Sequence, residues 1–514
     1  MARLSYLIAS CLGLLQSFGS ATAIPYPYNL APRVTRHNLT SEQARSELGP
    51  QLSKQAMIFG PGDSRFANIT ERYQTFSPPN IQVVVQPGSE SDVSKIVKYA
   101  NHNSIPFMAM NRRHALTSSV GKFSGIQIDM SLLRDINIQP NKKTAWFQGG
   151  AYDGQVIDYL WERGLVATTG SCTCVGMMGP GLGGGHGRYQ GLYGLISDNL
   201  VNLNVVLADG TAVRINQSSH PDLWWAMQGA GHNFGIVTSF ELKLHPRQLN
   251  TWYYRNYIFL DAQMDSVFEE INKLYKNGTG APGEFGSVGV YSMNPQYSKD
   301  KATLTWSFIY AGSAKDAAPY LAPFEKIQNV AREEGSVPYP QIAVIQGTDD
   351  ASENCQKNRT HITTTVNLQV FNVTAQRQIY NLYNQKIKEH PELSSAVATM
   401  ELYSVDAVRK VPQKQSSFAQ RDEYILNYFD VPFTEESSLE GFAEEWAKET
   451  RDLWNAGQPN RRPTTYLNYA FGDESLESIY GYDGQLDRLR NLKHKYDPEN
   501  RFQYYNPIIQ QSSY

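Results

Sequence analysis

The chain has 514 residues, 41% of them hydrophobic, which predicts a folded protein of roughly two to four domains with large cores. Its formal net charge of −3 and its lack of any dense lysine and arginine run exclude an extended basic surface for nucleic acid. The aromatic content of 12% suits a site for rings or sugars, and it suits a large core equally well.

The N-terminus has the pattern of a secretory signal peptide over residues 1–23. Arg3 precedes an apolar run from Leu4 to Leu15, and Ala21-Thr22-Ala23 supplies small residues at the spacing of a cleavage site. The apolar run is shorter than the ~20 residues that a membrane span needs. We therefore expect a secreted protein without a membrane segment, and N-glycans are expected at six Asn-x-Ser/Thr sequons, Asn38, Asn68, Asn216, Asn277, Asn358 and Asn372.

Removal of this segment leaves three cysteines, Cys172, Cys174 and Cys355. Three is an odd number, so at least one sulfur is free or bonded to something other than cysteine. Cys172 and Cys174 are poor partners for each other, because strand neighbours two residues apart point the same way at about 6–7 Å. A disulfide from Cys355 to either of them stays open as an alternative.

Residues 24–76 form an N-terminal segment with little periodicity, and regular structure is expected from residue 77. Apolar runs predict strands over 81–85, 105–110, 126–130, 144–148, 203–207 and 212–215, the last two joined by the turn Asp209-Gly210. Ser89 to Asp92 has helix-start chemistry for a helix reaching Ala100, and a second helix is expected over 155–163. Residues 77–247 are predicted to form the first domain.

A second domain is predicted over residues 248–460, where long alternating segments are mixed with helical ones. Strands are expected over 303–310 and 363–370, and helices over 262–275 and 318–333. A C-terminal segment, 461–514, follows with a helix over 484–496.

The densest chemical signal lies between Gly170 and Val237. Two cysteines are followed by glycines at 183, 184, 185 and 187, and a second glycine cluster stands at 229, 231 and 235. Because glycine costs conformational entropy, such clusters indicate unusual backbone angles or close contact with a flat group. A bound cofactor is the favoured interpretation, and a glycine-rich turn packed against a helix is the alternative.

Several segments in the same order resemble the berberine-bridge-enzyme-like FAD-linked oxidoreductases, which have the vanillyl-alcohol-oxidase type of FAD-binding fold, and especially their secreted fungal members. They are VVVQPGSESDVSKIVKYA, the loop holding His114, GSCTCVG, GLGGGHGRYQGLYGLISDN, DLWWAMQGAGHNFGIVTSFELKLHP, YLNYAFGDE and KYDPENRFQYYNPI. The resemblance covers nearly the whole chain after residue 23. It implies an α+β fold: a two-part FAD-binding domain with mixed sheets, a substrate domain with a large antiparallel sheet flanked by helices, and a C-terminal segment that returns to the FAD domain.

The resemblance also implies a covalently bound FAD. In that family a loop histidine bonds to the C8 methyl group of the flavin and a cysteine bonds to C6, positions that match His114 and Cys172 here. Attachment through His114 alone is the alternative. Arg112 and Arg113 stand where a glycine usually precedes the histidine, and they are expected beside the flavin, where they could stabilise its anionic reduced form. The remaining cofactor contacts implied are Val175, Gly176, Gly179, Gly183, Gly184, Gly185, Gly187, Gly235, Ile236 and Val237.

No metal site is expected. The alternative is a zinc site built from His114, Cys172, Cys174 and His186, but Cys-x-Cys without a second close pair is poor spacing for structural zinc.

Oxidation of the substrate needs a base, and the resemblance places a tyrosine at the substrate face. Tyr469 is the first choice and Tyr466 the second, with Asn468 between them; an ordinary structural role for this segment is the alternative. Glu401 and Asp406 are acids of the second domain that could assist, although their spacing does not distinguish them.

The predicted function is a secreted FAD-dependent oxidase. It moves hydride from an alcohol, sugar or secondary-metabolite intermediate to the flavin, and O2 then gives H2O2; Val175 stands where the family's oxidases have valine. Similar fungal proteins act in natural-product pathways. The alternatives are a dehydrogenase with another acceptor and a non-redox cyclase or binding protein on an FAD scaffold. No oligomeric state is predicted.

Overall fold

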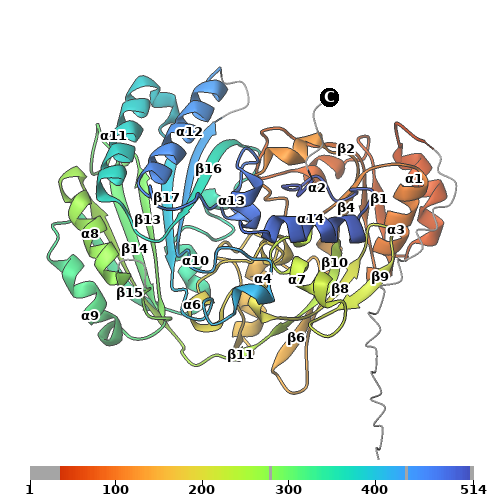
Figure 1. Cartoon of the computed structure of the whole chain (residues 1–514), viewed down its shortest axis with the longest axis horizontal. Coiled ribbons are helices and arrows are strands. Elements are labelled where there is room, and N and C mark those ends of the chain that lie inside the picture. The colour runs from red at the N-terminus through yellow and green to blue at the C-terminus, as the bar shows by residue number, and fades with distance from the viewer. Residues whose placement is uncertain (1–34, 277–279, 434–437, 510–514) are drawn as a thin grey trace, which may run out of the picture.

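The computed structural model describes residues 35–276, 280–433 and 438–509 and shows a mixed α+β protein in two parts (Figure 1). One part contains two smaller sheets, and the other is built on a seven-stranded sheet. The predicted signal peptide and the sequon at Asn277 lie outside the described residues.

The first sheet has the strand order β1-β2-β4-β3 and carries the helix α3. Strands β2, β4 and β3 are parallel, and β1 pairs antiparallel with β2. Ser89 and Asp92 form a capping box at the start of α3, as the sequence predicts. The elements are β1 (Met57–Phe59), β2 (Asn80–Gln86), α3 (Glu90–His102), β3 (Phe107–Met110) and β4 (Ser124–Asp129).

The expectation of little regular structure between residues 24 and 76 is wrong for the described part of that range. It contains α1 (Ser41–Glu47), β1 (Met57–Phe59) and α2 (Phe66–Thr70). Elements of three to seven residues are too short to show a hydrophobic period, and β1 is held by its pairing with β2.

The second sheet has the order β5-β6-β10-β8-β9 and is antiparallel throughout. Val206 of β8 and Ile236 of β10 belong to the same apolar core as Val83 and Ile126 of the first sheet, so the two sheets share one core. The strands are β5 (Ile136–Ile138), β6 (Thr144–Gln148), β8 (Leu200–Val206), β9 (Ala212–Ile215) and β10 (Ile236–Lys243); β7 (Leu165–Val166) pairs with β11 (His245–Pro246). The helices of this region are α4 (Asp153–Trp161), α5 (Met178–Gly181), α6 (Gln190–Tyr193) and α7 (Pro221–Met227).

The seven-stranded sheet is antiparallel, with the order β15-β12-β14-β13-β17-β18-β16. Four helices, α8, α9, α11 and α12, lie along its outer side in Figure 1. The strands are β12 (Trp252–Phe259), β13 (Phe285–Ser292), β14 (Thr303–Tyr310), β15 (Ala331–Val337), β16 (Thr360–Leu368), β17 (Val397–Tyr403) and β18 (Ile425–Phe433). The helices are α8 (Met264–Leu274), α9 (Ala314–Glu325), α10 (Ile342–Ile345), α11 (Val373–Glu389) and α12 (Glu440–Ala456).

The prediction of one helix over 318–333 is wrong in its second half. Helix α9 starts at a capping box formed by Ser313 and Asp316 and ends at Glu325. Residues 331–337 instead form the edge strand β15, where Glu334 stands opposite Arg255 of β12 and pairs with it through an ion pair of 2.6 Å. The strand is stabilised by a partner 79 residues away in sequence, which no local pattern reveals.

The C-terminal elements pack on the first part of the molecule (Figure 1). Leu467, Tyr480 and Leu489 share a core with Phe240 of β10, and Lys493 Nζ donates a hydrogen bond of 2.8 Å to the carbonyl oxygen of Asn233. These elements are a 3₁₀ turn at Leu467–Tyr469, α13 (Leu476–Tyr480) and α14 (Gln485–Tyr496). This return of the chain carries Tyr466 to Tyr469 to the boundary between the two parts.

None of the helices within 35–276, 280–433 and 438–509 has both the length and the apolar character needed to cross a membrane.

Candidate active site

A cavity of about 490 Å³ lies between the first part and the inner face of the seven-stranded sheet. Its wall combines the loop after β3, the cysteine-containing loop, strands β13, β17 and β18, and the turn at Leu467–Tyr469. Of the residues expected at the site, thirteen line it: Arg112, Arg113, His114, Cys172, Val175, Gly176, Gly179, Gly235, Ile236, Val237, Tyr466, Asn468 and Tyr469.

His114 lies on a loop that two arginines fix in place. Arg113 has a left-handed backbone angle, φ 62°, and its guanidinium forms an ion pair of 2.6 Å with the buried Asp129. Arg112 Nε donates a hydrogen bond of 2.9 Å to the carbonyl oxygen of Cys174. Both arginines therefore anchor the histidine loop, and Arg112 ties it to the cysteine loop.

The surroundings of His114 keep its ring neutral. Burial lowers its pKa to about 3, and the positive charges of Lys357 and Arg112 add to this effect. The ring stacks on Tyr73 at 5.0 Å between ring centres, and Tyr73 stacks in turn on His361 at 4.3 Å. A neutral imidazole keeps the free electron pair that a nucleophile needs.

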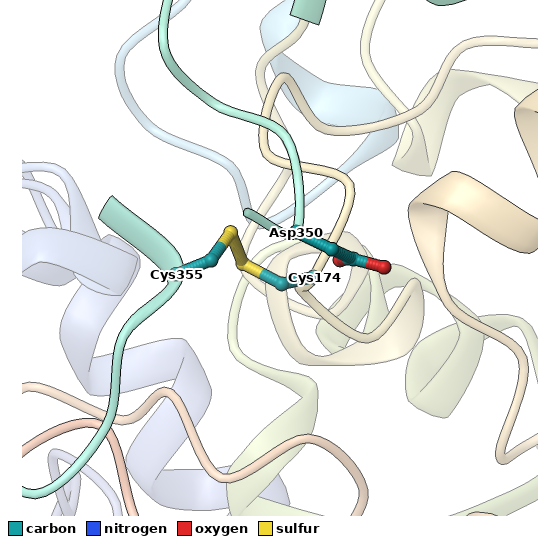
Figure 2. A group of neighbouring side chains, drawn as sticks. All are labelled: Cys174, Asp350 and Cys355. Carbon is teal, nitrogen blue, oxygen red and sulfur yellow. A yellow bond between two sulfur atoms is a disulfide. The ribbon is translucent and has the colours of Figure 1, made fainter. Parts of the chain in front are cut away.

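The two neighbouring cysteines, Cys172 and Cys174, have different roles. Cys174 forms a disulfide with Cys355 (Figure 2). Cys172 is free and lines the cavity. Of the two pairings left open for Cys355, the one with Cys174 is confirmed and the one with Cys172 is wrong. Burial raises the pKa of the Cys172 thiol to about 12, and the negative charge of Glu401 contributes.

The disulfide also removes the thiolate on which the zinc alternative depended. Asp350 lies beside the two bonded sulfurs, with all three ligand atoms within 4.8 Å of one another. A disulfide sulfur is a poor metal ligand compared with a thiolate, so this trio does not form a zinc site in the oxidised protein.

Gly183, Gly184, Gly185 and Gly187 pack closely against protein, and their neighbours Leu182 and His186 line the cavity. A Cβ atom on Gly187 would lie 1.8 Å from the carbonyl oxygen of Thr169, and one on Gly183 would lie 2.7 Å from Asn468 Oδ1. Gly184 and Gly185 have φ angles of 101° and 82°, which favour glycine. Tight packing of this turn therefore accounts for the glycines, and their contact with a cofactor stays a prediction.

Tyr469 is hydrogen-bonded to an acidic side chain of the cavity wall, Glu401. Its hydroxyl donates a hydrogen bond of 2.6 Å to Glu401 Oε1, and Tyr403 donates one of 2.7 Å to Glu401 Oε2. Glu401 stands on β17 with Val397 and Thr399 on the same face, while Asp406 is exposed outside the cavity wall. Burial raises the pKa of Tyr469 well above its usual value, and the charge of Glu401 adds to the shift.

Tyr466 and Asn468 are bound to each other. Asn468 Nδ2 donates a hydrogen bond of 2.7 Å to the Tyr466 hydroxyl and one of 3.0 Å to the carbonyl oxygen of Pro180. Tyr466 is buried and its pKa is raised to about 12, first by burial. Among the described residues no hydrogen bond joins Tyr466 to a carboxylate, whereas Tyr469 has one to Glu401.

Sequence reasoning missed several residues of the wall. Arg188 is buried and donates hydrogen bonds to Ser171, Gln346 and Thr348, and Tyr73 stacks on His114. For Glu401, sequence spacing provides no reason to prefer it over Asp406 as the acid that assists the base. The only available signal was the period-2 pattern of β17, which places residues 397, 399 and 401 on one face.

These groups fit a flavin. Two unpaired nucleophiles, His114 and Cys172, face one cavity from the loops that resemble the family's attachment sites. His186 Nε2, also on this wall, is buried without a partner in the described part of the chain, which leaves a polar atom for a bound molecule.

Comparison with known proteins agrees with this site. Residues 81–216 match the model of an FAD binding domain, and residues 465–509 match the family described as berberine and berberine like. The chain is 50% identical over 510 residues to FAD-linked oxidoreductase anuG of Penicillium roqueforti, covering 99% of this chain and 100% of the relative.

Two solved structures share the fold. Wild-type Physcomitrella patens BBE-like 1 superimposes with a TM-score of 0.78 at 20% identity, covering 92% of this chain and 100% of the other. Glucooligosaccharide oxidase from Acremonium strictum, described with a 6-S-cysteinyl, 8α-N1-histidyl FAD, has a TM-score of 0.75 at 18% identity, covering 90% and 98%. The chain belongs to the berberine-bridge-enzyme-like family of FAD-linked oxidoreductases.

Proposed function

We propose that this FAD-linked oxidoreductase is an alcohol oxidase with a covalently held flavin and O2 as its electron acceptor. When bound, FAD would supply the acceptor for hydride from the substrate carbon, and O2 would then take up both electrons to give H2O2. The observation that carries the proposal is the Tyr469–Glu401 pair, which shares one cavity with His114 and Cys172.

Tyr469 and Glu401 provide a path for the hydroxyl proton. The alcohol donates to the Tyr469 oxygen, and the Tyr469 proton moves along the 2.6 Å hydrogen bond to Glu401 Oε1. Because the pKa of Tyr469 is raised, a standing phenolate is disfavoured, and transfer through the tyrosine to the carboxylate avoids one. Tyr403 and Ser171 hold Glu401 in place, since Tyr403 bonds to both.

His114 and Cys172 are proposed as the two points of flavin attachment. His114 is neutral and so can act as a nucleophile, and Cys172 is the free sulfur of the cavity. The Acremonium oxidase, which shares the fold, is described with one histidyl and one cysteinyl bond to its FAD, and this supports the assignment.

O2 is proposed as the acceptor because Val175 lines the cavity beside Gly176, leaving a small side chain next to the cysteine loop. A dehydrogenase using another acceptor is the second candidate, and it rests on the same hydride chemistry. Slow reoxidation of the flavin in air distinguishes it.

The substrate is proposed to be an alcohol with an apolar body. Val288 and Val290 of β13 stand opposite Glu401 and Thr399 of β17, and Val397 continues the same wall. Sugar hydroxyls facing these valines would be left without partners, at a cost of roughly 1–3 kcal/mol each. Of the polar side chains on the cavity wall, Gln346 and Thr348 already bond to Arg188.

A substrate panel tests this proposal. Cinnamyl alcohol and 1-octanol are compared with cellobiose and xylobiose, scoring H2O2 release. Apolar alcohols are expected to have kcat/KM values roughly 5- to 150-fold higher per unsatisfied sugar hydroxyl, which corresponds to about 1–3 kcal/mol. Val290→Thr should raise KM for the apolar alcohols, and Val344→Thr, at an exposed valine, should not. Oxidation of the sugars alone would contradict the substrate class and leave an oxidase, whereas no oxidation of either class would contradict both.

Secretion and a role in a fungal natural-product pathway are also part of this proposal. Residues 1–23 support secretion by their sequence, and four sequon asparagines, Asn38, Asn68, Asn358 and Asn372, are exposed. The pathway role is supported by the resemblance to fungal members and by the fungal relative.

A further inference from the structure

The disulfide joins two loops that are far apart in sequence and meet at the cavity. Cys174 belongs to the loop that holds Cys172, and Cys355, 181 residues later, follows a loop of the second part between α10 and β16 (Figure 2). Gln346, Thr348 and Asn354 of that second loop line the same cavity as Cys172.

Thr348 adds a second set of bonds between these loops. Its carbonyl oxygen accepts from the Thr173 amide at 2.9 Å, and its hydroxyl donates to the Ser171 carbonyl oxygen at 3.0 Å. The Arg188 guanidinium bridges both loops, because it donates a hydrogen bond of 2.8 Å to the Ser171 carbonyl oxygen and one of 2.9 Å to the Thr348 hydroxyl.

The result is a free thiol between fixed neighbours. Ser171 is held by Arg188 and Tyr403, and the Thr173 carbonyl oxygen accepts from the Gly154 amide at 2.9 Å. Cys174 is held by its disulfide and by Arg112, whose loop carries His114. Of residues 171–174, Cys172 alone keeps a side chain without a protein partner, and its sulfur faces the cavity.

We propose that the Cys174–Cys355 disulfide is a positioning device for Cys172, which holds this thiol where its bond to the flavin forms. This inference rests on the proposed covalent attachment. The disulfide also occupies the sulfur of Cys355, so Cys355 cannot pair with Cys172 instead.

Formation of the bond between Cys172 and the flavin is a two-electron oxidation. The thiol sulfur replaces a hydrogen of the flavin ring, so one S–H bond and one C–H bond break and one C–S bond forms. Both hydrogens leave as protons, and the two electrons pass through the ring to O2, giving H2O2. Loss of position slows such a step strongly, since a misplacement of about 1 Å costs up to about 100-fold.

The double variant Cys174→Ser/Cys355→Ser tests the proposal, because it removes the disulfide and leaves Cys172 without a competing partner. The readout is peptide mass after proteolysis of purified protein, which reports flavin on the Cys172 peptide and on the His114 peptide separately. When apoprotein is loaded with FAD, bond formation at Cys172 is expected to slow at least about tenfold, with the His114 bond formed as in the wild type.

Single variants separate positioning from mispairing. Cys174→Ser is expected to form a Cys172–Cys355 disulfide and lose the Cys172 bond altogether, and Cys172→Ser marks the single-attachment limit. Wild-type rates of bond formation at Cys172 in the double variant would overturn the proposal. Wild-type protein with no flavin on the Cys172 peptide would instead overturn the proposed attachment itself.

Discussion

At the scale of single residues, the site depends on ionisable groups that the fold keeps in defined protonation states. His114 is held neutral by burial and neighbouring cations, and Tyr469 is held protonated by burial and by Glu401. Glu401 lines the cavity and is fixed by hydrogen bonds from two tyrosines. In the proposed mechanism the reaction depends on the ability of Glu401 to receive a proton.

Glu401→Gln should lower the rate of flavin reduction by about 10²–10⁴-fold, because the amide still accepts the Tyr469 hydrogen bond and cannot take its proton. The measurement is anaerobic flavin bleaching by an alcohol substrate. Asp406→Asn is the matched control, since that acid is exposed outside the cavity. Flavin content should be unchanged in both variants, and a wild-type bleaching rate in Glu401→Gln would exclude the carboxylate as proton acceptor.

Asp153→Asn should become more stable relative to the wild type as pH rises. Asp153 is fully buried, and burial raises its pKa from 3.8 to about 8. Because the pKa of Asp153 is higher in the folded than in the unfolded protein, its carboxyl group contributes its full stabilisation below pH ~4. This contribution is lost as the pH rises through about 8. Asparagine does not titrate and can still accept the Gly170 amide, which lies 2.9 Å from Asp153 Oδ1.

The difference in unfolding free energy should therefore grow between pH 4 and 8, by up to about 1.4 kcal/mol per pH unit. Urea unfolding of both proteins at pH 5 and pH 7 measures it. Equal differences at the two pH values would show that Asp153 is already ionised in the folded protein.

At the scale of elements, the sequence predicted what local patterns encode. The capping box at Ser89 and the strands of the first part follow from residue types within a few positions. Strands β15 and β1 did not, because pairing with strands distant in sequence holds them. Helices α1 and α2 have seven and five residues, too few to show a hydrophobic period. His114 and Cys172 were found through matching motifs, whereas Glu401 meets Tyr469 from 68 residues away and needed the structure.

The structure gives the glycine turn a packing role, and Gly187→Ala tests that role. A Cβ there would overlap the Thr169 carbonyl oxygen at 1.8 Å, so the backbone must shift, at a cost of about 1–3 kcal/mol. Thermal unfolding should show a lower Tm. Gly441→Ala, in α12 with nothing within 4 Å, should keep or raise Tm. Equal Tm values for Gly187→Ala and the wild type would show that this turn has room to spare.

At the scale of the whole molecule, the cavity exists because two parts of the chain close on each other. The first part supplies His114 and Cys172, and the seven-stranded sheet supplies Glu401 and the valine wall. The C-terminal segment brings Tyr469 between them while packing on the first part. One hydrogen-bond chain, from Ser171 through Tyr403 and Glu401 to Tyr469, then joins the cysteine loop to the base.

The most direct test of this account is a single turnover followed by its electron count. Purified enzyme is mixed anaerobically with one equivalent of an alcohol found in the panel, and air is then admitted. The account predicts complete bleaching of the flavin with one aldehyde or ketone formed per flavin, then rapid return of colour with one H2O2 per flavin. Bleaching without prompt reoxidation would contradict the oxidase assignment, and product formation without bleaching would contradict hydride transfer to the flavin.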